Sequence, residues 1–304
     1  MDLQTFQNLP TKEIAKLVRA AGPKVCVFPI NGTRRWYMLE HAELAENGST
    51  ESYAQLITRR LIDILKIFFD HGVDTILVPL FGPDLMERSD SYEQVGVQGL
   101  SSFAQNHEAL DFYNAYDVRV RIYGDAQRYF QDTAYASTLP IFENLSQRTV
   151  ENQTHRLFLG ICGHDATETV AEIGVQFYQE HGHLPNKRQI VEAYYGEYVE
   201  PVDFFIGSGQ PAAFDMPLVA TGEEDLYFTV APSAYLNAEL LRTILYDHLY
   251  ARPAETSDYV ELSTKDWQRM ADFYTVNRQA VLGVGAQQNG NKFWSPLPQV
   301  KTGH

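Results

Sequence analysis

Residues 24–36 have the sequence KVCVFPINGTRRW, an apolar run that leads into a polar and basic turn. The run at 24–30 has the β-branched and aromatic composition of a buried strand. A helix that begins near Thr33 would direct free N–H groups toward an anion, and Gly32 would let the backbone approach it closely. Arg34 and Arg35 could then grip a phosphate with paired hydrogen bonds. The alternative is a solvated loop whose arginines lie at the surface.

The same alternation of apolar runs and helical stretches continues along the chain. Strands are predicted at residues 75–80, 118–123, 156–162, 203–206 and 226–230. Helices are predicted at 52–71, at 165–180 with Asp165 as N-cap, and at 239–250. Strands separated by helices imply right-handed crossovers and a parallel sheet. We therefore expect a single α/β domain over residues 1–286, with a central, mostly parallel sheet flanked by helices, and a flexible tail at 287–304.

Charge and composition exclude several classes of partner. The 304 residues include 24 Lys and Arg against 39 Asp and Glu, a formal net charge of −15. Such a chain has no general attraction for nucleic acid or anionic membranes, so an anionic substrate needs a local basic cluster. No signal-peptide pattern and no 18-residue apolar window are present, and the two cysteines occupy apolar runs. We expect a cytoplasmic protein with reduced thiols and no integral membrane segment.

Aromatic residues make up 12% of the chain, with 18 Tyr and 17 Phe. They either fill the core or line a pocket for a bulky apolar or cationic ligand. In a parallel sheet, ligands bind beyond the carboxyl ends of the strands, so the segments that follow strands are the ones to compare.

These segments resemble the cis-prenyltransferase (undecaprenyl diphosphate synthase) superfamily over roughly residues 22–250. That family follows its first strand with Asp-Gly-Asn-(Gly/Arg)-Arg-Trp, similar to the turn at 31–36. Other matches, in the same order, are FGPDLMER (81–88), VRVRIYGD (118–125), PVDFFI (201–206) and LYFT (226–229). The resemblance implies the family's α/β fold, a diphosphate site after the first strand, and a homodimer.

The departures from the family are as informative as the matches. Chain-elongating members place arginines after the Pro-Val-Asp strand to hold a second diphosphate, but no Lys or Arg occurs between Arg188 and Arg242. We expect the second diphosphate site to be lost, because burial of an uncompensated diphosphate is prohibitive. One diphosphate site remains, which resembles the branch containing tuberculosinol synthase (tuberculosinyl adenosine transferase) and kolavelool synthase. In that branch the loop has the sequence Phe-Pro-x-Asp-Gly-Thr-Arg-Arg-Trp.

The resemblance assigns roles to individual residues. Arg34, Arg35 and Arg88 would hold the departing diphosphate, together with the backbone N–H groups of Gly32 and Thr33. Tyr53 and Tyr92 match tyrosines that stabilise the cation and position the nucleophile. Without the family context, either tyrosine would be interpreted as a core aromatic residue with a satisfied hydroxyl group.

Asn31 departs from the branch, which has Asp at this position to ligate Mg²⁺ or to act as a base. An amide oxygen is a poor magnesium ligand and accepts no proton at neutral pH. Asn31 is therefore either a natural variant, in which the substrate is ionised by other groups, or an inactivating substitution of Asp. The resemblance offers Asp225 as a second metal ligand, and a solvated loop acid is the alternative.

Three functions remain open at this stage. The first is a diterpene synthase that removes diphosphate from a bicyclic diterpenyl diphosphate of kolavenyl or tuberculosinyl type, with Mg²⁺, and quenches the allylic cation with water. The second is a diterpenyl transferase that uses a nucleoside such as adenosine as acceptor. The third is a catalytically silent partner subunit of a cis-prenyltransferase, for which Asn31 and the missing arginines would be natural.

Overall fold

The computed structural model describes residues 1–43, 50–87, 90–213, 218–252, 263–287 and 294–297, with the backbone alone at 50–52 and 90–92. At its centre is a six-stranded sheet in the order β3-β4-β2-β1-β5-β6, in which every pair of neighbouring strands is parallel. The strands are β1 (Val25–Val27), β2 (Thr75–Phe81), β3 (Val118–Tyr123), β4 (His155–Ile161), β5 (Phe204–Ser208) and β6 (Asp225–Thr229). All six strands predicted from apolar runs are confirmed.

Helices connect successive strands from β1 to β5, as parallel pairing requires, whereas the described residues between β5 and β6 form no helix. Between the amino terminus and β4 lie α1 (Leu3–Gln7), α2 (Thr11–Ala20), α3 (Thr33–Glu40), α5 (Thr50–Asp70), α6 (Asp90–Gln105), α7 (His107–Ala115), α8 (Ala126–Phe130) and α9 (Leu139–Arg148). After β4 follow α10 (Thr167–His181), α11 (Lys187–Tyr195), α12 (Ala238–Tyr246) and α13 (Thr264–Asn277). The short turns are η1 (Pro83–Leu85), η2 (Ala134–Thr138), η3 (Ser233–Tyr235) and η4 (Asp247–Ala251).

Two of the predicted helix boundaries were wrong in detail. The N-cap position of α10 is Ala166 rather than Asp165, although the Asp165 carboxylate still accepts a hydrogen bond from the Thr167 N–H at 2.9 Å. The predicted helix 239–250 is α-helical only to Tyr246 and continues as the π-helical turn η4.

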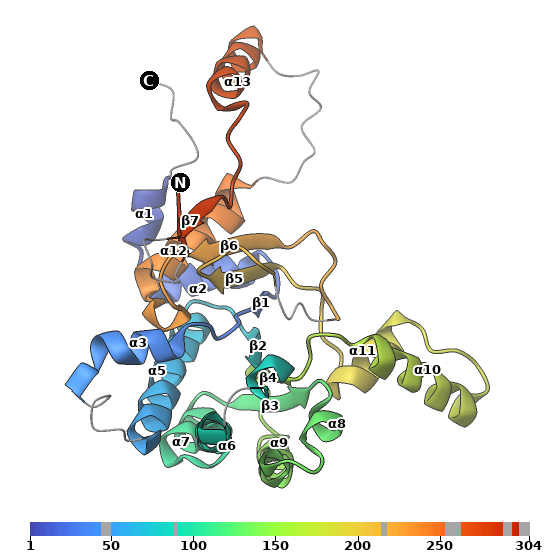
Figure 1. Ribbon diagram of the computed structural model, residues 1–304. Helices are drawn as coiled ribbons and strands as arrows, with labels where there is room; N and C mark the ends of the chain where they lie inside the picture. Colours follow the sequence, from blue (N-terminus) through green and yellow to red (C-terminus); the bar gives the residue numbers. More distant parts are fainter. Residues whose placement is uncertain (44–49, 88–89, 214–217, 253–262, 288–293, 298–304) are drawn as a thin grey trace.

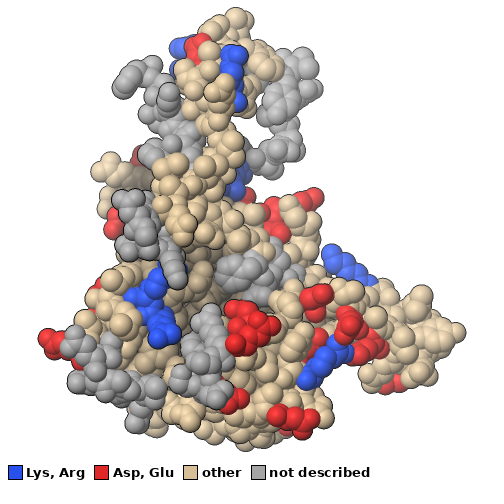
Figure 2. Space-filling model, in the orientation of Figure 1, with Lys and Arg blue, Asp and Glu red and all other residues tan. Residues whose placement is uncertain are grey.

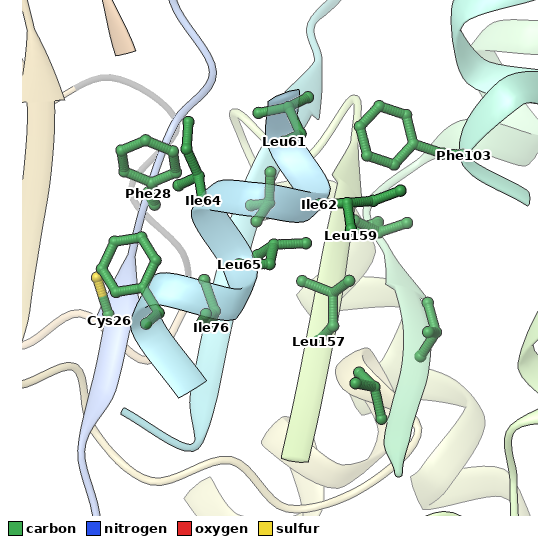
Figure 3. Packing of buried hydrophobic residues seen from close by; sticks show 14 of the residues in the cluster. Cys26, Phe28, Leu61, Ile62, Ile64, Leu65, Ile76, Phe103, Leu157 and Leu159 are labelled. Atoms are coloured by element: carbon green, nitrogen blue, oxygen red, sulfur yellow. The ribbon is translucent and has the colours of Figure 1, made fainter. Parts of the chain in front are cut away.

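The sheet separates two apolar layers, because side chains alternate between its faces. On one face, Cys26, Ile76 and Leu157 pack against α5, whose Leu61, Ile64 and Leu65 point at the sheet (Figure 3). On the other face, Val25, Val27 and Leu77 pack with residues of α11, including Tyr195. In the view of Figure 1, α5, α6, α7 and α9 lie below and to the left of the sheet, and α10 and α11 lie to its right. Most of the Phe and Tyr residues fill these layers.

The last part of the chain leaves the sheet. In Figure 1, α13 stands away from the body, and none of its side chains is buried. β7 (Gly285–Gln287) and β8 (Trp294–Pro296) form a small antiparallel sheet, so residues 287 and 294–296 of the predicted flexible tail belong to strands. The other residues of that tail lie outside the description, apart from Leu297. Within the described part of the chain, no helix is both long and apolar enough to cross a bilayer.

Candidate active site

The loop after β1 lies at the carboxyl edge of the sheet, where it turns into α3. Gly32 is the N-cap of α3 and has φ 74°, a left-handed conformation that side chains rarely adopt. A Cβ atom on Gly32 would lie 3.0 Å from both the Arg35 guanidinium and Pro232. Glycine is thus required twice here, for the backbone angle and for the close approach. The first N–H groups of an α-helix have no partner within the helix, so those of α3 are donors that an anion at the loop can use.

Two serines fix Asn31 at the start of this loop. The Asn31 N–H donates to Ser233 Oγ at 3.0 Å, and the Asn31 carbonyl accepts from both the N–H and the hydroxyl group of Ser233. The side-chain amide Nδ2 of Asn31 donates to the Ser208 carbonyl at 3.1 Å. Ser208 ends β5 and Ser233 begins η3, and both are buried. The loop is therefore held between elements that are about 200 residues away along the chain.

Arg34 and Arg35 are exposed, and within the described residues neither has a carboxylate or hydrogen-bond partner. Most of the other described arginines are paired with a carboxylate or donate hydrogen bonds to backbone carbonyls. Those paired with carboxylates are Arg19, Arg59, Arg119, Arg121, Arg128, Arg156, Arg188, Arg252 and Arg269, while Arg60 and Arg242 donate to backbone carbonyls. Figure 2 shows basic side chains at the surface in the region of α3. Two adjacent, uncompensated guanidiniums in so acidic a chain are suited to hold a multiply charged anion.

The loop opens onto a cavity of about 360 Å³ between β1, β2, α5 and α6, which we call the inner cavity. Its volume is in the usual range for small-molecule sites. Its lining comprises Ile30, Asn31, Gly32, Thr33, Arg34, Arg35, Tyr53, Ala54, Ile57, Thr58, Leu61, Leu80, Phe81, Leu85, Val95, Gly96, Gly99, Leu100 and Phe103. The wall is mainly aliphatic, with aromatic rings only from Tyr53, Phe81 and Phe103 among the described lining residues. The cavity is polar where the loop lines it and aliphatic farther in, and it is less aromatic than the composition allowed.

Tyr53 lines the inner cavity and also contacts the loop. Its hydroxyl group lies 2.9 Å from Thr33 Oγ1, and its ring meets the buried ring of Tyr37 edge to face at 5.0 Å. The structure thus brings Tyr53 together with Asn31, Gly32, Thr33, Arg34 and Arg35, as predicted.

The remaining predicted residues are placed differently. Arg88 lies outside the described residues, as does the side chain of Tyr92, whose backbone is in the first turn of α6. Asp225 is the first residue of β6, at the amino edge of the sheet and opposite the loop. Its carboxylate is paired with His248 at 2.7 Å and Arg252 at 2.9 Å. Asp225 is therefore not part of the site that we describe.

A second cavity, the outer cavity, lies on the other side of the same loop. It has a volume of about 930 Å³ and shares Asn31, Arg34 and Arg35 with the inner cavity. Its other lining residues are Met38, Leu39, Ser208, Gly209, Gln210, Ala212, Val230, Pro232, Trp294 and Ser295. A third cavity, beside η1, brings the exposed acids Asp84 and Glu87 and the imidazole of His164 near Asn31.

The donors at the loop do not fit a magnesium site held by the protein. Mg²⁺ is usually bound by one or two carboxylates together with substrate phosphates. No carboxylate is among the described residues that line the inner or outer cavity, and Asn31 already uses its amide toward Ser208. Asp84 and Glu87 line only the third cavity, which does not include Arg34 or Arg35. No group of three His, Cys, Asp or Glu residues among those described could hold a metal ion. Mg²⁺ therefore stays a prediction from the resemblance, and no step below depends on it.

Ser208, Ser233 and Trp294 are site residues that sequence reasoning missed. A signal for Ser233 was present, because it lies four residues after the matched segment LYFT (226–229). Ser208 is the last residue of the strand that begins after Pro-Val-Asp. From the sequence, only the absence of arginines in this stretch was considered. For Trp294, neither composition nor spacing offers a signal.

Comparison with solved structures defines the class of protein. The chain is similar to lavandulyl diphosphate synthase from Lavandula x intermedia in complex with dimethylallyl diphosphate, with a TM-score of 0.59 and 16% identity over 76% of this chain and 97% of that one. It is also similar to a probable undecaprenyl diphosphate synthase from Campylobacter jejuni, with a TM-score of 0.57 and 12% identity over the same shares of the two chains. The fold is that of the cis-prenyltransferases.

Sequence relatives narrow the class to one family. The chain is 40% identical over 287 residues to tuberculosinyl adenosine transferase of Mycobacterium tuberculosis (strain CDC 1551 / Oshkosh), covering 94% of this chain and 95% of the relative. It is 27% identical over 288 residues to (+)-kolavelool synthase of Herpetosiphon aurantiacus, covering 92% and 91%. No protein-family model matches the chain. This chain belongs to the family of these two enzymes, as the loop sequence indicated.

Proposed function

We propose that this chain ionises a bicyclic diterpenyl diphosphate and passes the allylic cation to a neutral acceptor. The observation that carries the proposal is the position of Arg34 and Arg35 at the start of α3, beside a cavity with an aliphatic inner wall; among the described residues neither arginine has a carboxylate or hydrogen-bond partner. When the C–O bond breaks, both electrons leave with the diphosphate. Guanidinium groups and free backbone N–H groups stabilise that developing charge without reorganising.

The inner cavity supports a hydrocarbon as the other half of the substrate. Its deeper wall is formed by aliphatic side chains such as Ile57, Leu61 and Leu100, and burial of apolar surface favours binding. Tyr53 lies between that wall and the loop, where its π face can stabilise a carbocation. The 40% identical relative is named for a diterpenyl substituent, which supports a substrate of this size.

Two acceptors follow from the relatives. Capture by water gives an alcohol, as the name of the kolavelool synthase implies for that enzyme. Capture by a nucleoside gives an adduct, as the name of the tuberculosinyl adenosine transferase implies. Water must lose a proton when it attacks, and the Asn31 amide cannot take it at neutral pH. The nucleoside is favoured by the outer cavity, which adjoins the same arginines.

The test is to incubate the purified chain alone with clerodane-type and halimane-type diterpenyl diphosphates, with and without adenosine. Diphosphate release and the products by mass spectrometry are the readouts. We expect release from at least one substrate, and turnover without another protein excludes the silent-subunit alternative. No release above the blank from any of these substrates would contradict the proposal. Light scattering of the same sample tests the expected homodimer.

A further inference from the structure

The short turn η3 is bonded to the residue that begins the loop at 31–35. The N–H and the hydroxyl group of Ser233 both donate to the Asn31 carbonyl, at 3.0 and 2.9 Å, and Ser233 Oγ accepts from the Asn31 N–H at 3.0 Å. Pro232, the N-cap of η3, lies so close that a Cβ atom on Gly32 would be 3.0 Å from it. The position of η3 therefore sets the backbone from which the anion donors project.

The far end of α3 is bonded to the same turn. Tyr235, the last residue of η3, donates its hydroxyl group to the carboxylate of Glu40, the last residue of α3. Since Asn31 lies just before the N-cap of α3, η3 contacts this helix at both of its ends. Any displacement of η3 would move α3 and, with it, Arg34 and Arg35.

Arg60 of α5 in turn holds η3. Its Nε donates to the Ala234 carbonyl and its Nη2 donates to the Leu236 carbonyl, each at 2.7 Å. Ala234 and Leu236 are both buried, so the loss of these donors would leave two carbonyls without compensation. Among the described residues, Arg60 is paired with no carboxylate, and it lines neither the inner nor the outer cavity.

We propose that Arg60 is a positioning residue of the diphosphate site. Through η3 it fixes the Asn31 backbone and the start of α3, so that the donors of the loop are already in place when the C–O bond breaks. The inference rests on the proposed function for the identity of the anion. Donors that need no reorganisation stabilise a developing charge best, and a misplacement of about 1 Å can cost about 100-fold in rate.

The two contacts of Arg60 require a guanidinium group. The carbonyls of Ala234 and Leu236 are two residues apart in the turn, and the planar guanidinium presents its donors to them in fixed directions. A lysine ammonium keeps the positive charge, but on a flexible stem it does not hold two carbonyls in a fixed relative position. Arg60→Lys therefore separates the geometric role from the charge.

The experiment measures the affinity for inorganic diphosphate by calorimetry in the parent chain and in Arg60→Lys. We expect binding to be weaker by about tenfold or more, which corresponds to the loss of one charge-assisted hydrogen bond to the anion. Arg242→Lys is the matched control. Arg242 donates to the backbone carbonyls of Gln7 and Leu9, at 2.5 and 3.1 Å, and lines neither cavity. It should lose stability in urea unfolding but keep the diphosphate affinity.

Two further measurements separate positioning from a general loss of structure. A clerodane-type diterpenyl alcohol has the hydrocarbon but no diphosphate, so it should bind equally well to Arg60→Lys and to the parent. Ser233→Ala removes the hydroxyl bonds to Asn31 at the other end of the connection and should also weaken diphosphate binding. Because both residues act through η3, the double variant should lose less affinity than the two single losses combined.

The outcomes separate this inference from the proposed function. Unchanged diphosphate affinity in Arg60→Lys or in Ser233→Ala would overturn it, as would an equal loss in Arg242→Lys or a parallel loss of alcohol binding. If both site variants weaken diphosphate binding but the parent ionises no diterpenyl diphosphate, the role of Arg60 stands and the proposed function fails. If the parent ionises the substrate and Arg60→Lys has the same kcat, the proposed function stands and the role of Arg60 is wrong.

Discussion

The amide of Asn31 donates from Nδ2 to the carbonyl oxygen of Ser208 at 3.1 Å, a contact that joins the β1 loop to the end of β5. A carboxylate at this position has no proton to donate at neutral pH, and it would face the carbonyl oxygen as a second acceptor. The contact is therefore made by asparagine and lost with aspartate.

Asn31→Asp should make ionisation depend on magnesium. The new carboxylate supplies a ligand that Mg²⁺ prefers, so we expect diphosphate release to rise with added Mg²⁺ and to fall with a chelator. The parent chain should respond less, because the described residues that line the inner cavity beside Arg34 and Arg35 include no acid. Loss of the bond to Ser208 should lower the free energy of unfolding by about 1 kcal/mol.

The matched control for this variant is Asn152→Asp. Asn152 also donates its amide to a backbone carbonyl, that of Val118 at 2.9 Å, but it follows α9 and does not line the site. It should lose similar stability in thermal or urea unfolding without acquiring a magnesium response. An equal response in both variants would show that the metal acts on the substrate alone.

Replacing either arginine of the loop should slow ionisation. Arg34→Gln and Arg35→Gln each remove a charged donor from the departing diphosphate, and the loss of such a donor typically costs about 10²- to 10³-fold in turnover. Competition by inorganic diphosphate should weaken in parallel. Arg148→Gln, an exposed arginine at the end of α9 on another part of the surface, should change neither value. An undiminished rate in both loop variants would place the diphosphate elsewhere.

Tyr53→Phe tests the role of the hydroxyl group separately from that of the ring. The variant keeps the edge-to-face contact with Tyr37 but loses the hydrogen bond to Thr33, so we expect about tenfold lower turnover at nearly unchanged stability. Tyr53→Leu removes the π face as well and should be slower still. In Tyr116→Phe, a hydroxyl bond to Asp70 away from the loop is lost, and steady-state kinetics should stay at the parent level.

Most of the sheet could be predicted because β1, β2, β4 and β5 are buried apolar runs, which are visible in one sequence. In β3 apolar residues alternate with Arg119 and Arg121, and β6 is only partly buried. The loop at 31–35 could be predicted for the same reason, since it directly follows the first strand. The place of Asp225 could also be predicted, because Asp225 precedes the predicted strand 226–230 and therefore lies at the amino edge of a parallel sheet, opposite the site. The resemblance suggested it as a metal ligand from the order of segments alone. Trp294 reaches the site only through the pairing of β8 with β7, for which the sequence offers no periodic pattern.

Stability should depend on pH through Asp74, which joins β2 to α2 and β4. Burial raises the pKa of Asp74, but the bidentate bond from Arg19 and the contact with His155 outweigh it and lower the pKa overall. Because the folded pKa is depressed, the contribution is complete above the unfolded value of about 3.9 and is lost as the pH falls through the folded value. Asp74→Asn should therefore lower the free energy of urea unfolding at pH 7 and converge with the parent below about pH 4. Asp63 forms an exposed pair with Lys66 at 3.8 Å. In Asp63→Asn, the free energy of unfolding should show no such pH-dependent difference from the parent.

Gly99 should set the size of the prenyl group. It lines the inner cavity from α6, and a Cβ atom there would meet no heavy atom within 4 Å. Gly99→Ala should raise stability by about 0.4–1 kcal/mol, because alanine restricts the unfolded chain and favours the helix. Gly99→Leu should project into the cavity and reduce kcat/KM for the diterpenyl diphosphate about tenfold or more, while C10 and C15 prenyl diphosphates still bind. Gly174 in α10 is equally free of neighbours but lines none of these cavities, so Gly174→Leu should leave substrate preference unchanged. Equal use of C20 and shorter diphosphates by parent and Gly99→Leu would show that the hydrocarbon does not occupy the inner cavity.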